Sequence, residues 1–276
     1  MLNPSNENHD DYFKHGHYKT VRMNVRSFKI YADGALGSRG ANLIEPYADK
    51  HGHYGFLLAS EQEFRDMAKL LNEHGFQMNT HAIGDSANRL LLDIYGNVLG
   101  GKNDKRWRIE HSQIINPADM DKFGKYSIIP SVQPTHATSD MYWAGDRLGQ
   151  ERIKHAYPFK ELMEQNGYIP LGSDFPVEDI NPFYTFHAAV ARHDATIWPE
   201  SGFQMENALS RENALRGMTI WAAKSNFEEK EKGSIEPGKF ADFILVDRDL
   251  MTIEPAQMRA TQVISTYVNG KQVYKK

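Results

Sequence analysis

Short apolar runs alternate with amphipathic segments through the first two thirds of the chain. This alternation is typical of a parallel sheet whose strands are joined by right-handed helical crossovers. Ser60 and Glu63 have the spacing of a capping box, which predicts a helix that ends near Gly75. Residues 136–149 are expected to form a loop, and residues 181–225 are expected to be helical. The runs that predict strands read FKIYAD, FQMNTHA, RWRIEH, SIIPSVQ and YIPLGSD.

The ends of the chain differ from this α/β body. Residues 1–20 are polar and form a segment of their own, residues 21–230 form the body, and residues 231–276 change to short strands and turns. Asn269-Gly270 lies between two apolar runs and predicts a hairpin. Five strands cannot close a (β/α)₈ barrel, so the body is either an open sheet or the C-terminal part of a longer barrel. In the second case the strand within residues 21–33 is expected at an open edge.

Composition limits the partners of the protein. The formal net charge is −4 with dispersed Lys and Arg, which gives no electrostatic reason to expect nucleic acid or anionic membrane as a partner. The absence of cysteine excludes disulfides, thiolate metal ligands and a thiol nucleophile. The polar start is not a signal peptide, and no apolar stretch is long enough to span a bilayer. We therefore expect a cytoplasmic protein with a small-molecule substrate, able to form homo-oligomers.

Four of the apolar runs end at or beside a residue that can bind a metal: Lys29, His81, His111 and Asp174. In (β/α) barrels the loops after the strands gather at one face and build the active site. Nitrogen and oxygen ligands without thiolates suit Zn²⁺ or a similar divalent ion. Taken alone, each histidine is more simply explained as a core residue bonded to the backbone. Their recurrence one strand–helix unit apart favours the metal, and Gly84 is expected to allow the sharp turn after His81.

Asp174 and Lys29 each have two interpretations. Asp174 can bind a metal and accept a proton from water, or it can cap a turn, as aspartates often do. Lys29 interrupts an apolar strand, where a neutral amine can add CO₂ and become a bridging carbamate. An ion-paired or snorkelling lysine on an edge strand is the alternative, and composition favours it.

Other polar residues follow the same strand ends. Gln133 and His136 lie at the end of the fourth apolar run, where they could orient a substrate, and Arg152 could bind a carboxylate or carbonyl. Two His-x-His pairs have no apolar strand before them, so we expect loop or surface roles for both. These pairs are His15 with His17 and His51 with His53.

Six motifs occur in a fixed order from about Val25 to the C-terminus: KIYADGALGSR, THAIGD, RIEHSQ, QPTHATSDM, GSDFPVEDINP and GSIEPGKFADFILVD. Together they resemble the amidohydrolase-3 family of the amidohydrolase superfamily, which includes N-substituted formamide deformylase-like proteins. The resemblance implies a metal-dependent hydrolase with a distorted TIM barrel and a small β-sandwich. Residues 21–230 would supply barrel strands 4–8 with their helices, and residues 231–276 a C-terminal sandwich segment.

The resemblance also implies roles for the residues at the strand ends. Lys29 would be a carboxylated ligand, His81 and His111 histidine ligands, and Asp174 both ligand and catalytic base of a site for one or two divalent ions, with Zn²⁺ the first expectation. The implied reaction is hydrolysis of a C–N bond in an amide, formamide or cyclic amide by metal-activated water.

The family pattern contains three earlier barrel strands and a His-x-His ligand pair that this sequence does not match. We therefore expect a truncated product, a domain fragment or an incomplete gene model, poorly soluble or oligomeric and inactive alone. The functional alternative is a catalytically inactive amidohydrolase-like fragment or pseudoenzyme with a binding role. A nucleotide-binding open sheet is a third hypothesis, but it requires a phosphate loop directly between strand and helix, and a long irregular segment follows Gly34 instead.

Overall fold

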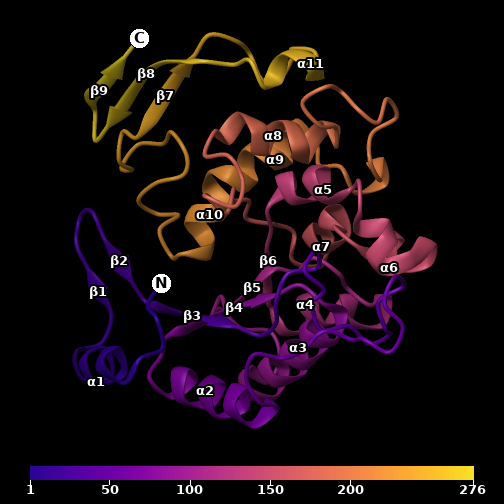
Figure 1. The fold of residues 1–276 in the computed structure, drawn as a ribbon. Coiled ribbons are helices and arrows are strands. Elements are labelled where there is room, and N and C mark those ends of the chain that lie inside the picture. The colour runs from indigo at the N-terminus through magenta and orange to yellow at the C-terminus, as the bar shows by residue number, and fades with distance from the viewer. The chain divides into compact units, whose positions relative to one another are not determined.

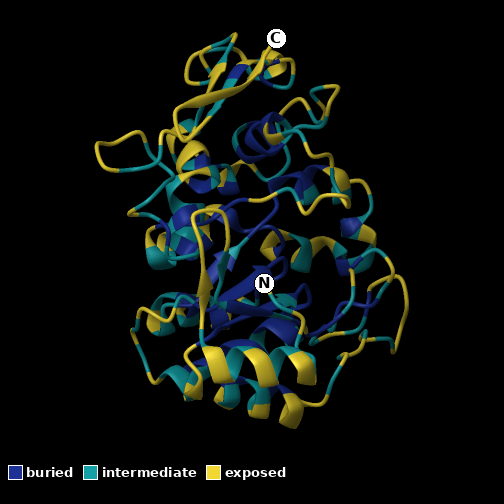
Figure 2. Cartoon of the chain, turned by 90° about the vertical axis from the view of Figure 1, so that its left-hand side faces the viewer, coloured by how far each residue is buried: buried dark blue, intermediate teal, exposed yellow.

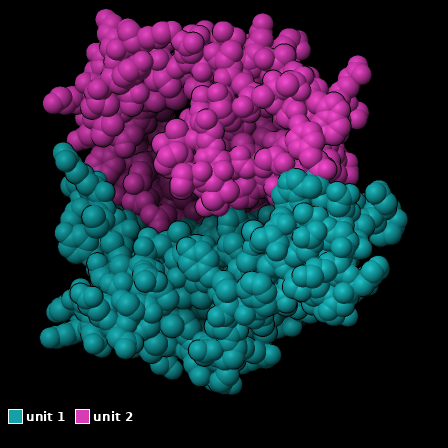
Figure 3. Space-filling view, viewed as in Figure 1, with its two compact units in different colours: residues 1–131, 143–166 teal, residues 132–142, 167–276 magenta.

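The computed structural model describes all of residues 1–276 and divides into two compact units (Figure 3). Unit 1 comprises Met1–Ser131 and Trp143–Asn166, and unit 2 comprises Val132–Tyr142 and Gly167–Lys276. Residues 1–20 therefore belong to unit 1, and residues 231–276 belong to unit 2. None of the helices combines the length and the apolar character that crossing a membrane requires.

Unit 1 is a mixed α/β unit built around a parallel sheet, as the alternating pattern predicts (Figure 1). Its helices and strands are α1 (Asn6–His15), β1 (Tyr18–Lys19), β2 (Asn24–Val25), β3 (Ser27–Tyr31), α2 (Glu61–Glu73), β4 (Gln77–Ala82), α3 (Asp85–Leu99), β5 (Arg108–His111), α4 (Met120–Tyr126), β6 (Ile129–Ser131), α6 (Ala144–Arg152) and α7 (Phe159–Asn166). Short 3₁₀ helices occupy Pro117–Asp119 and Ile153–His155.

The four strands of the main sheet are all parallel and follow the order β3-β4-β5-β6. One face of the sheet is apolar and lies against helices α2 and α3 (Figure 1). Thr80 on this face bonds through its hydroxyl to the Tyr95 hydroxyl of α3 at 2.7 Å, and Phe28 and Met78 are fully buried. Figure 2 shows the strands as buried and the outward sides of the helices as exposed. Burial of this face accounts for the apolar runs in the sequence.

The opposite face of the same sheet is polar. Lys29, Asn79 and Arg108 lie in one row across three strands, and His81 and Glu110 lie in the next. Arg108 donates from Nε to Glu110 at 2.8 Å, although both side chains are buried. A buried ion pair of this kind is retained only where further polar groups satisfy it. The interruption of the first strand by Lys29 is thus one part of a polar surface that runs across the sheet.

The outer edge of β3 carries a single pairing partner. Leu2 forms an isolated parallel bridge with Phe28, and its carbonyl accepts from the Lys29 amide at 2.8 Å. The N-terminal segment is also more ordered than its polarity suggests, because Ser5 caps α1 and Phe13 of that helix stacks on His74 at 4.1 Å. The strand expected through residues 21–33 is shorter in the structure, since β2 pairs with β1 in a hairpin and β3 begins separately.

Unit 2 contains five α-helices and an antiparallel sheet. Its elements are α5 (Pro134–Asp140), α8 (Pro182–Ala191), α9 (Arg211–Met218), α10 (Ile220–Ser225), β7 (Phe243–Val246), α11 (Pro255–Met258), β8 (Val263–Val268) and β9 (Lys271–Lys275), with a 3₁₀ turn at Met205–Asn207. The sheet has the order β7-β8-β9. Asn269 and Gly270 form the β8–β9 turn with left-handed φ of 50° and 75°, which confirms the predicted hairpin.

Three local expectations were wrong. The segment expected to be a loop contains α5 and α6, because Pro134 starts a helix well and is easily taken for a breaker. The stretch expected to be helical is interrupted at residues 192–210, after a left-handed residue at Arg192 ends α8. The run YIPLGSD contributes only a one-residue parallel bridge from Leu171 to Val132 instead of a full strand.

Candidate metal centre

His81 and His111 lie at the ends of neighbouring strands β4 and β5 in unit 1. Their ring centroids are 4.5 Å apart and the rings are inclined at 70°. Alternation along β5 would direct the His111 side chain to the same face as Ile109, away from His81. His111 instead has a φ of +75°, and this left-handed backbone brings its ring to the ring of His81. The structure therefore brings together the two predicted histidines.

The backbone strain continues into the residue after His111. Ser112 has a φ of +42°, and its hydroxyl bonds to the Ile109 carbonyl at 3.0 Å. Left-handed conformations at residues other than glycine cost roughly 1–3 kcal/mol and concentrate at functional sites. Two such residues in succession at the end of β5 support a functional role for the direction of the His111 side chain.

Asp33 organises this end of the sheet, and its role was not predicted from the sequence. Its buried carboxylate accepts backbone N–H groups from Ile83 at 3.0 Å, Gly84 at 2.8 Å and Asn42 at 2.9 Å. The same carboxylate lies 3.5 Å from Nε2 of His81. A carboxylate beside a ligand histidine fixes the orientation and tautomer of the ring. The only local signal is the sequence Asp33-Gly34 directly after a strand.

Burial raises the pKa of Asp33 to about 7, although the three backbone donors act in the opposite direction. The carboxyl is thus held in balance between the protonated and ionised forms near neutral pH. A nearby cation would favour the ionised form.

Gly84 is required for a different reason from the one expected. Its φ of −72° and ψ of 150° suit any residue, so the turn after His81 needs no left-handed glycine. A Cβ atom at this position would lie 2.0 Å from the Asn42 carbonyl oxygen. The glycine therefore permits close contact between the loop after β3 and the start of α3.

Lys29 lies on the polar face of the sheet, in the row with Asn79 and Arg108. Its Nζ is 4.4 Å from the ring centroid of Tyr31, and its charge acts on Glu110. Burial disfavours the ionised form of Glu110, but Arg108, a hydroxyl bond from Ser131 and the charge of Lys29 together lower its pKa. Carboxylation of Lys29 stays a prediction.

In unit 2, Asp174 lies beside His136. His136 Nε2 is 3.8 Å from Asp174 Oδ2, and Asp174 has a left-handed φ of +60° with 40% of its side chain exposed. Burial lowers the pKa of His136 to about 4, so its ring is neutral at pH 7. Gln133 is buried and precedes the first residue of α5, with His136 in the first turn of that helix. The structure thus brings Asp174 and His136 together.

Arg152 bonds to backbone carbonyl groups of α6 and of the loop after β3. Its guanidinium donates to the carbonyl groups of Leu148 at 2.8 Å, Glu45 at 2.9 Å and Pro46 at 2.7 Å. These contacts tie the end of α6 to the loop after β3 and favour a structural role over the predicted binding of substrate.

Three histidines of the two His-x-His pairs have hydrogen-bond partners within the protein. His15 bonds to Asp11 at 2.9 Å on the same helix, and His17 lies 3.1 Å from the Gly75 carbonyl. His53 lies 2.8 Å from the Arg39 carbonyl. These contacts agree with the surface and loop roles expected of both pairs.

The donor set at the end of the sheet fits a divalent metal. Two imidazoles in contact, with a carboxylate oriented toward one of them, are the ligand and outer-shell types that Zn²⁺ uses in proteins. No group of three or more His, Asp or Glu side chains in the structure is itself arranged to hold a metal ion.

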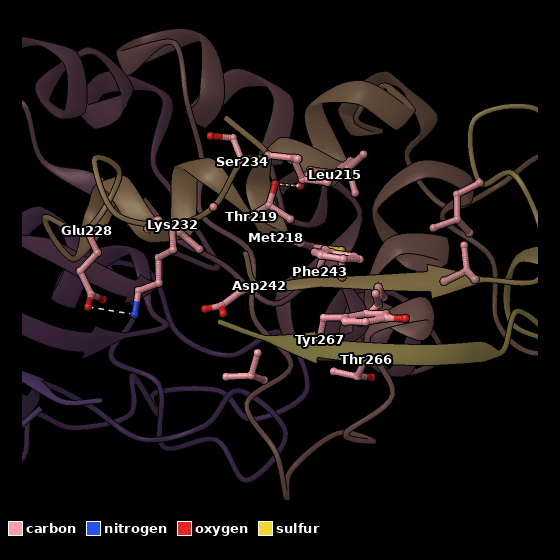
Figure 4. A pocket seen from close by; sticks show the side chains of 18 of the residues that line it. Leu215, Met218, Thr219, Glu228, Lys232, Ser234, Asp242, Phe243, Thr266 and Tyr267 are labelled. Atoms are coloured by element: carbon pink, nitrogen blue, oxygen red, sulfur yellow. Dashed lines mark hydrogen bonds and ion pairs between the residues drawn. The ribbon is translucent and has the colours of Figure 1, made fainter. Parts of the chain in front are cut away.

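A cavity of about 990 Å³ lies elsewhere in unit 2, between α9–α10 and strands β7–β8 (Figure 4). Phe243 and Tyr267 stack at 4.6 Å on its sheet side, and Glu228 pairs with Lys232 at 2.9 Å near its rim. The cavity is lined by none of the predicted metal ligands or substrate-binding residues. The cavity is therefore not the candidate metal centre, despite its size.

A model of the amidohydrolase family matches residues 4–274, which is nearly the whole chain. The chain belongs to the amidohydrolase family. Protein LONG AFTER FAR-RED 3 of Arabidopsis thaliana is 37% identical over 249 residues, which cover 89% of this chain and 42% of that protein. The putative amidohydrolase YtcJ of Bacillus subtilis is 31% identical over 250 residues, covering 91% and 47%.

Two further comparisons bear on the chemistry of this amidohydrolase. N-substituted formamide deformylase of Arthrobacter pascens is 28% identical over 255 residues, covering 91% of this chain and 46% of that enzyme. A crystal structure described as an uncharacterized metal-dependent hydrolase from Pyrococcus horikoshii matches with a TM-score of 0.81 and 28% identity, covering 92% and 51%. The chain thus spans about half the length of the proteins it matches.

Proposed function

We propose that this amidohydrolase hydrolyses C–N bonds of small amides, formamides or cyclic amides, with Lys29, His81 and His111 as metal ligands and Asp174 as ligand and base. The contact between His81 and His111 is the observation that carries the proposal. It depends on a strained backbone at His111, which is difficult to explain by packing alone. The similarity to N-substituted formamide deformylase and to a metal-dependent hydrolase supports the reaction class.

The chain's own residues would have distinct tasks. With Asp33 on the Nε2 side of His81, Nδ1 is the nitrogen that we propose as the metal ligand. The Asp174 carboxylate would accept a proton from the attacking water at Oδ2 and return it to the leaving nitrogen. His136, neutral and 3.8 Å from Oδ2, would orient that carboxylate or a substrate carbonyl, and Gln133 would contribute an amide to the same region. A bound divalent cation would supply Lewis acidity and increase the acidity of water.

We also propose that β3–β6 correspond to strands 4–7 of a (β/α)₈ barrel, with Leu171 in the position of the eighth. The three-stranded sheet β7-β8-β9 would be the C-terminal segment of a β-sandwich. The parallel order of β3–β6, the antiparallel order of β7–β9 and the match to the hydrolase from Pyrococcus horikoshii support this assignment. A solved structure that shows β3–β6 as part of an open sheet within the assembled protein would contradict it.

The alternative is a non-catalytic amidohydrolase-like protein with a binding role. The metal content of the purified protein is the first measurement that distinguishes the two proposals. We expect purified protein, loaded with Zn²⁺ and passed through a desalting column, to retain metal near one equivalent per chain or more. His81→Ala and His111→Ala should each lose most of it, while His15→Ala, an exposed histidine paired with Asp11, should not. Elemental analysis by mass spectrometry gives the measurement.

A panel of N-substituted formamides and cyclic amides then tests the reaction. Release of amine or formate that depends on added metal supports the proposal. Equal metal retention by the wild type and both histidine variants would reject the ligand assignment, and stable metal with no turnover on any member of the panel would favour the binding role.

A further inference from the structure

Three residues of unit 2, spaced at intervals of three on α5 and the turn after it, each contact an acidic side chain. His136 lies 3.8 Å from Asp174, and Ser139 donates from its hydroxyl to Glu178 at 2.6 Å. Tyr142 donates its hydroxyl to Asp194. Side chains three residues apart are neighbours on a helical surface. The row therefore leads from His136, which lies beside Asp174, to Tyr142, an axial rise of roughly 9 Å for six residues at the spacing of an α-helix.

The far end of this row is an exposed pair of stacked aromatic rings. Tyr142 and Trp198 have centroids 5.1 Å apart and planes inclined at only 9°. Their exposed fractions are 56% and 50%, so both rings keep apolar surface that faces solvent. Exposed aromatic surface of this kind commonly marks a binding site, and ring faces prefer planar partners.

One carboxylate holds both members of the aromatic pair in position. Asp194 accepts the Tyr142 hydroxyl, and it accepts the backbone N–H groups of Thr196 at 2.7 Å and Trp198 at 3.0 Å. The Thr196 hydroxyl also donates to Asp194 at 2.9 Å. The stack is thus fixed before any ligand arrives, which reduces the entropy cost of binding.

The chain segment next to Asp174 is apolar and exposed as well. Phe175, Val177 and Ile180 follow Asp174 directly and all face solvent. Glu178 lies among them, but its carboxylate accepts the Ser139 hydroxyl. Because Glu178 contacts Ser139 in the middle of the row, this segment runs beside the row and offers exposed apolar side chains there to a substrate.

We propose that Tyr142 and Trp198 form a subsite for an aromatic or other planar apolar substituent on the substrate nitrogen. The inference rests on the proposed function, because it takes Asp174 as the position of the hydrolysed bond. It adds a substrate class: amides whose nitrogen carries a planar ring on a short linker. Formamides with small alkyl substituents would reach Asp174 without contacting the rings.

The test compares N-phenethylformamide with N-ethylformamide, which differ by one phenyl ring. Binding to the full chain carrying Asp174→Asn is measured by ligand-observed NMR titration, and turnover is measured separately with wild-type protein. We expect the phenyl compound to bind about tenfold more tightly, the ratio that one aromatic stacking contact typically provides. Trp198→Leu keeps an apolar side chain without a ring face and should remove most of that ratio, whereas Trp198→Phe should retain much of it.

The control is Tyr54→Ala, which removes an exposed aromatic ring of unit 1 and should leave the ratio unchanged. Circular dichroism establishes that each variant is folded. Three outcomes would overturn the subsite. They are an affinity ratio of the two formamides near one in the parent protein, no binding of either formamide, and an affinity ratio that Trp198→Leu leaves unchanged. Turnover with a ratio insensitive to Trp198 would overturn the subsite alone. A Trp198-dependent ratio without any turnover would overturn the hydrolase proposal and leave the aromatic surface as a binding site.

Discussion

His111 in unit 1 and Asp174 in unit 2 share a left-handed backbone, yet their surroundings differ. His111 is 7% exposed and is followed by Ser112, which is fully buried and bonded to the strand it leaves. Asp174 is far more exposed, and Phe175 and Val177 after it face solvent. One strained residue is thus held by a buried network and the other lies in an open loop. The difference suits a fixed ligand in the first case and a group that exchanges protons with water and substrate in the second.

Asp33 and Asp174 show the same contrast between two carboxylates. Asp33 has no exposed side-chain surface and accepts three backbone N–H groups, two of them from residues about 50 positions away in sequence. Asp174 lies beside one imidazole and is open to solvent. Buried carboxylates with several donors stabilise a fold, whereas an accessible carboxylate beside a neutral histidine can perform proton transfer. We therefore expect substitution of Asp33 to affect stability and substitution of Asp174 to affect turnover.

The largest effect is expected from Asp174→Asn. In preparations that hydrolyse an amide, loss of the base should reduce kcat by about 10²–10⁴-fold. The free energy of unfolding should change by no more than about 0.5 kcal/mol, because the side chain is exposed. Steady-state kinetics and urea denaturation give the two quantities. Asp179→Asn, at a residue whose carboxylate only accepts the Asn181 amide, serves as the control. Near-normal kcat in Asp174→Asn would place the base elsewhere.

The sequence predicts this contrast only in part. The ends of β4 and β5 agree with the apolar runs to within a residue, because burial of one face produces a strong local pattern. The histidines at those ends could therefore be identified as neighbours. The left-handed φ of His111 could not, since no glycine or asparagine marks the position.

Local sequence patterns do not predict contacts between segments that are distant in the sequence. Asp33 meets Ile83 across 50 residues of sequence, and the need for Gly84 comes from the Asn42 carbonyl, which lies in a different loop. Arg152 has the sequence context of an exposed helical charge, but two of its three carbonyl partners lie more than 100 residues earlier. These residues acquire their roles only when the loop after β3 folds onto the helices of unit 1.

Asp33→Asn should have the second largest effect. An amide retains one acceptor oxygen but places its NH₂ group either against the backbone donor of Ile83 or against those of Gly84 and Asn42. A buried donor left without an acceptor costs about 1–3 kcal/mol, so we expect the free energy of unfolding to fall by that amount. Urea denaturation followed by tryptophan fluorescence measures it, with Asp174→Asn as the matched carboxylate control. Equal stability of the two variants would show that the network around Asp33 does not hold the end of the sheet together.

The smallest expected effect is a difference in how the stabilities of the two units respond to pH. Burial, with the nearby charges of Arg259 and His193, lowers the pKa of His187 in α8 to about 4, from an ordinary 6.5. Between these values the unfolded chain binds a proton that the folded chain does not, so stability around α8 falls as pH drops from 6.5 toward 4. At pH 5 the loss should be about 2 kcal/mol relative to neutral pH.

Asp33 should respond in the opposite direction, because its folded pKa of about 7 lies above the ordinary 3.8. Its contribution to stability is complete below pH 3.8 and is lost as pH rises through 7. Hydrogen exchange of metal-free protein at pH 7 and pH 5, corrected for intrinsic rates, measures both responses. Lowering the pH from 7 to 5 should decrease protection in α8 and increase protection near β4. His187→Phe fills a similar volume, and neither ring nitrogen of His187 has a hydrogen-bond partner, so this variant should keep its fold and lose the acid sensitivity of α8. Parallel changes in both segments would show that global charge, and not these two buried groups, governs the response to acid.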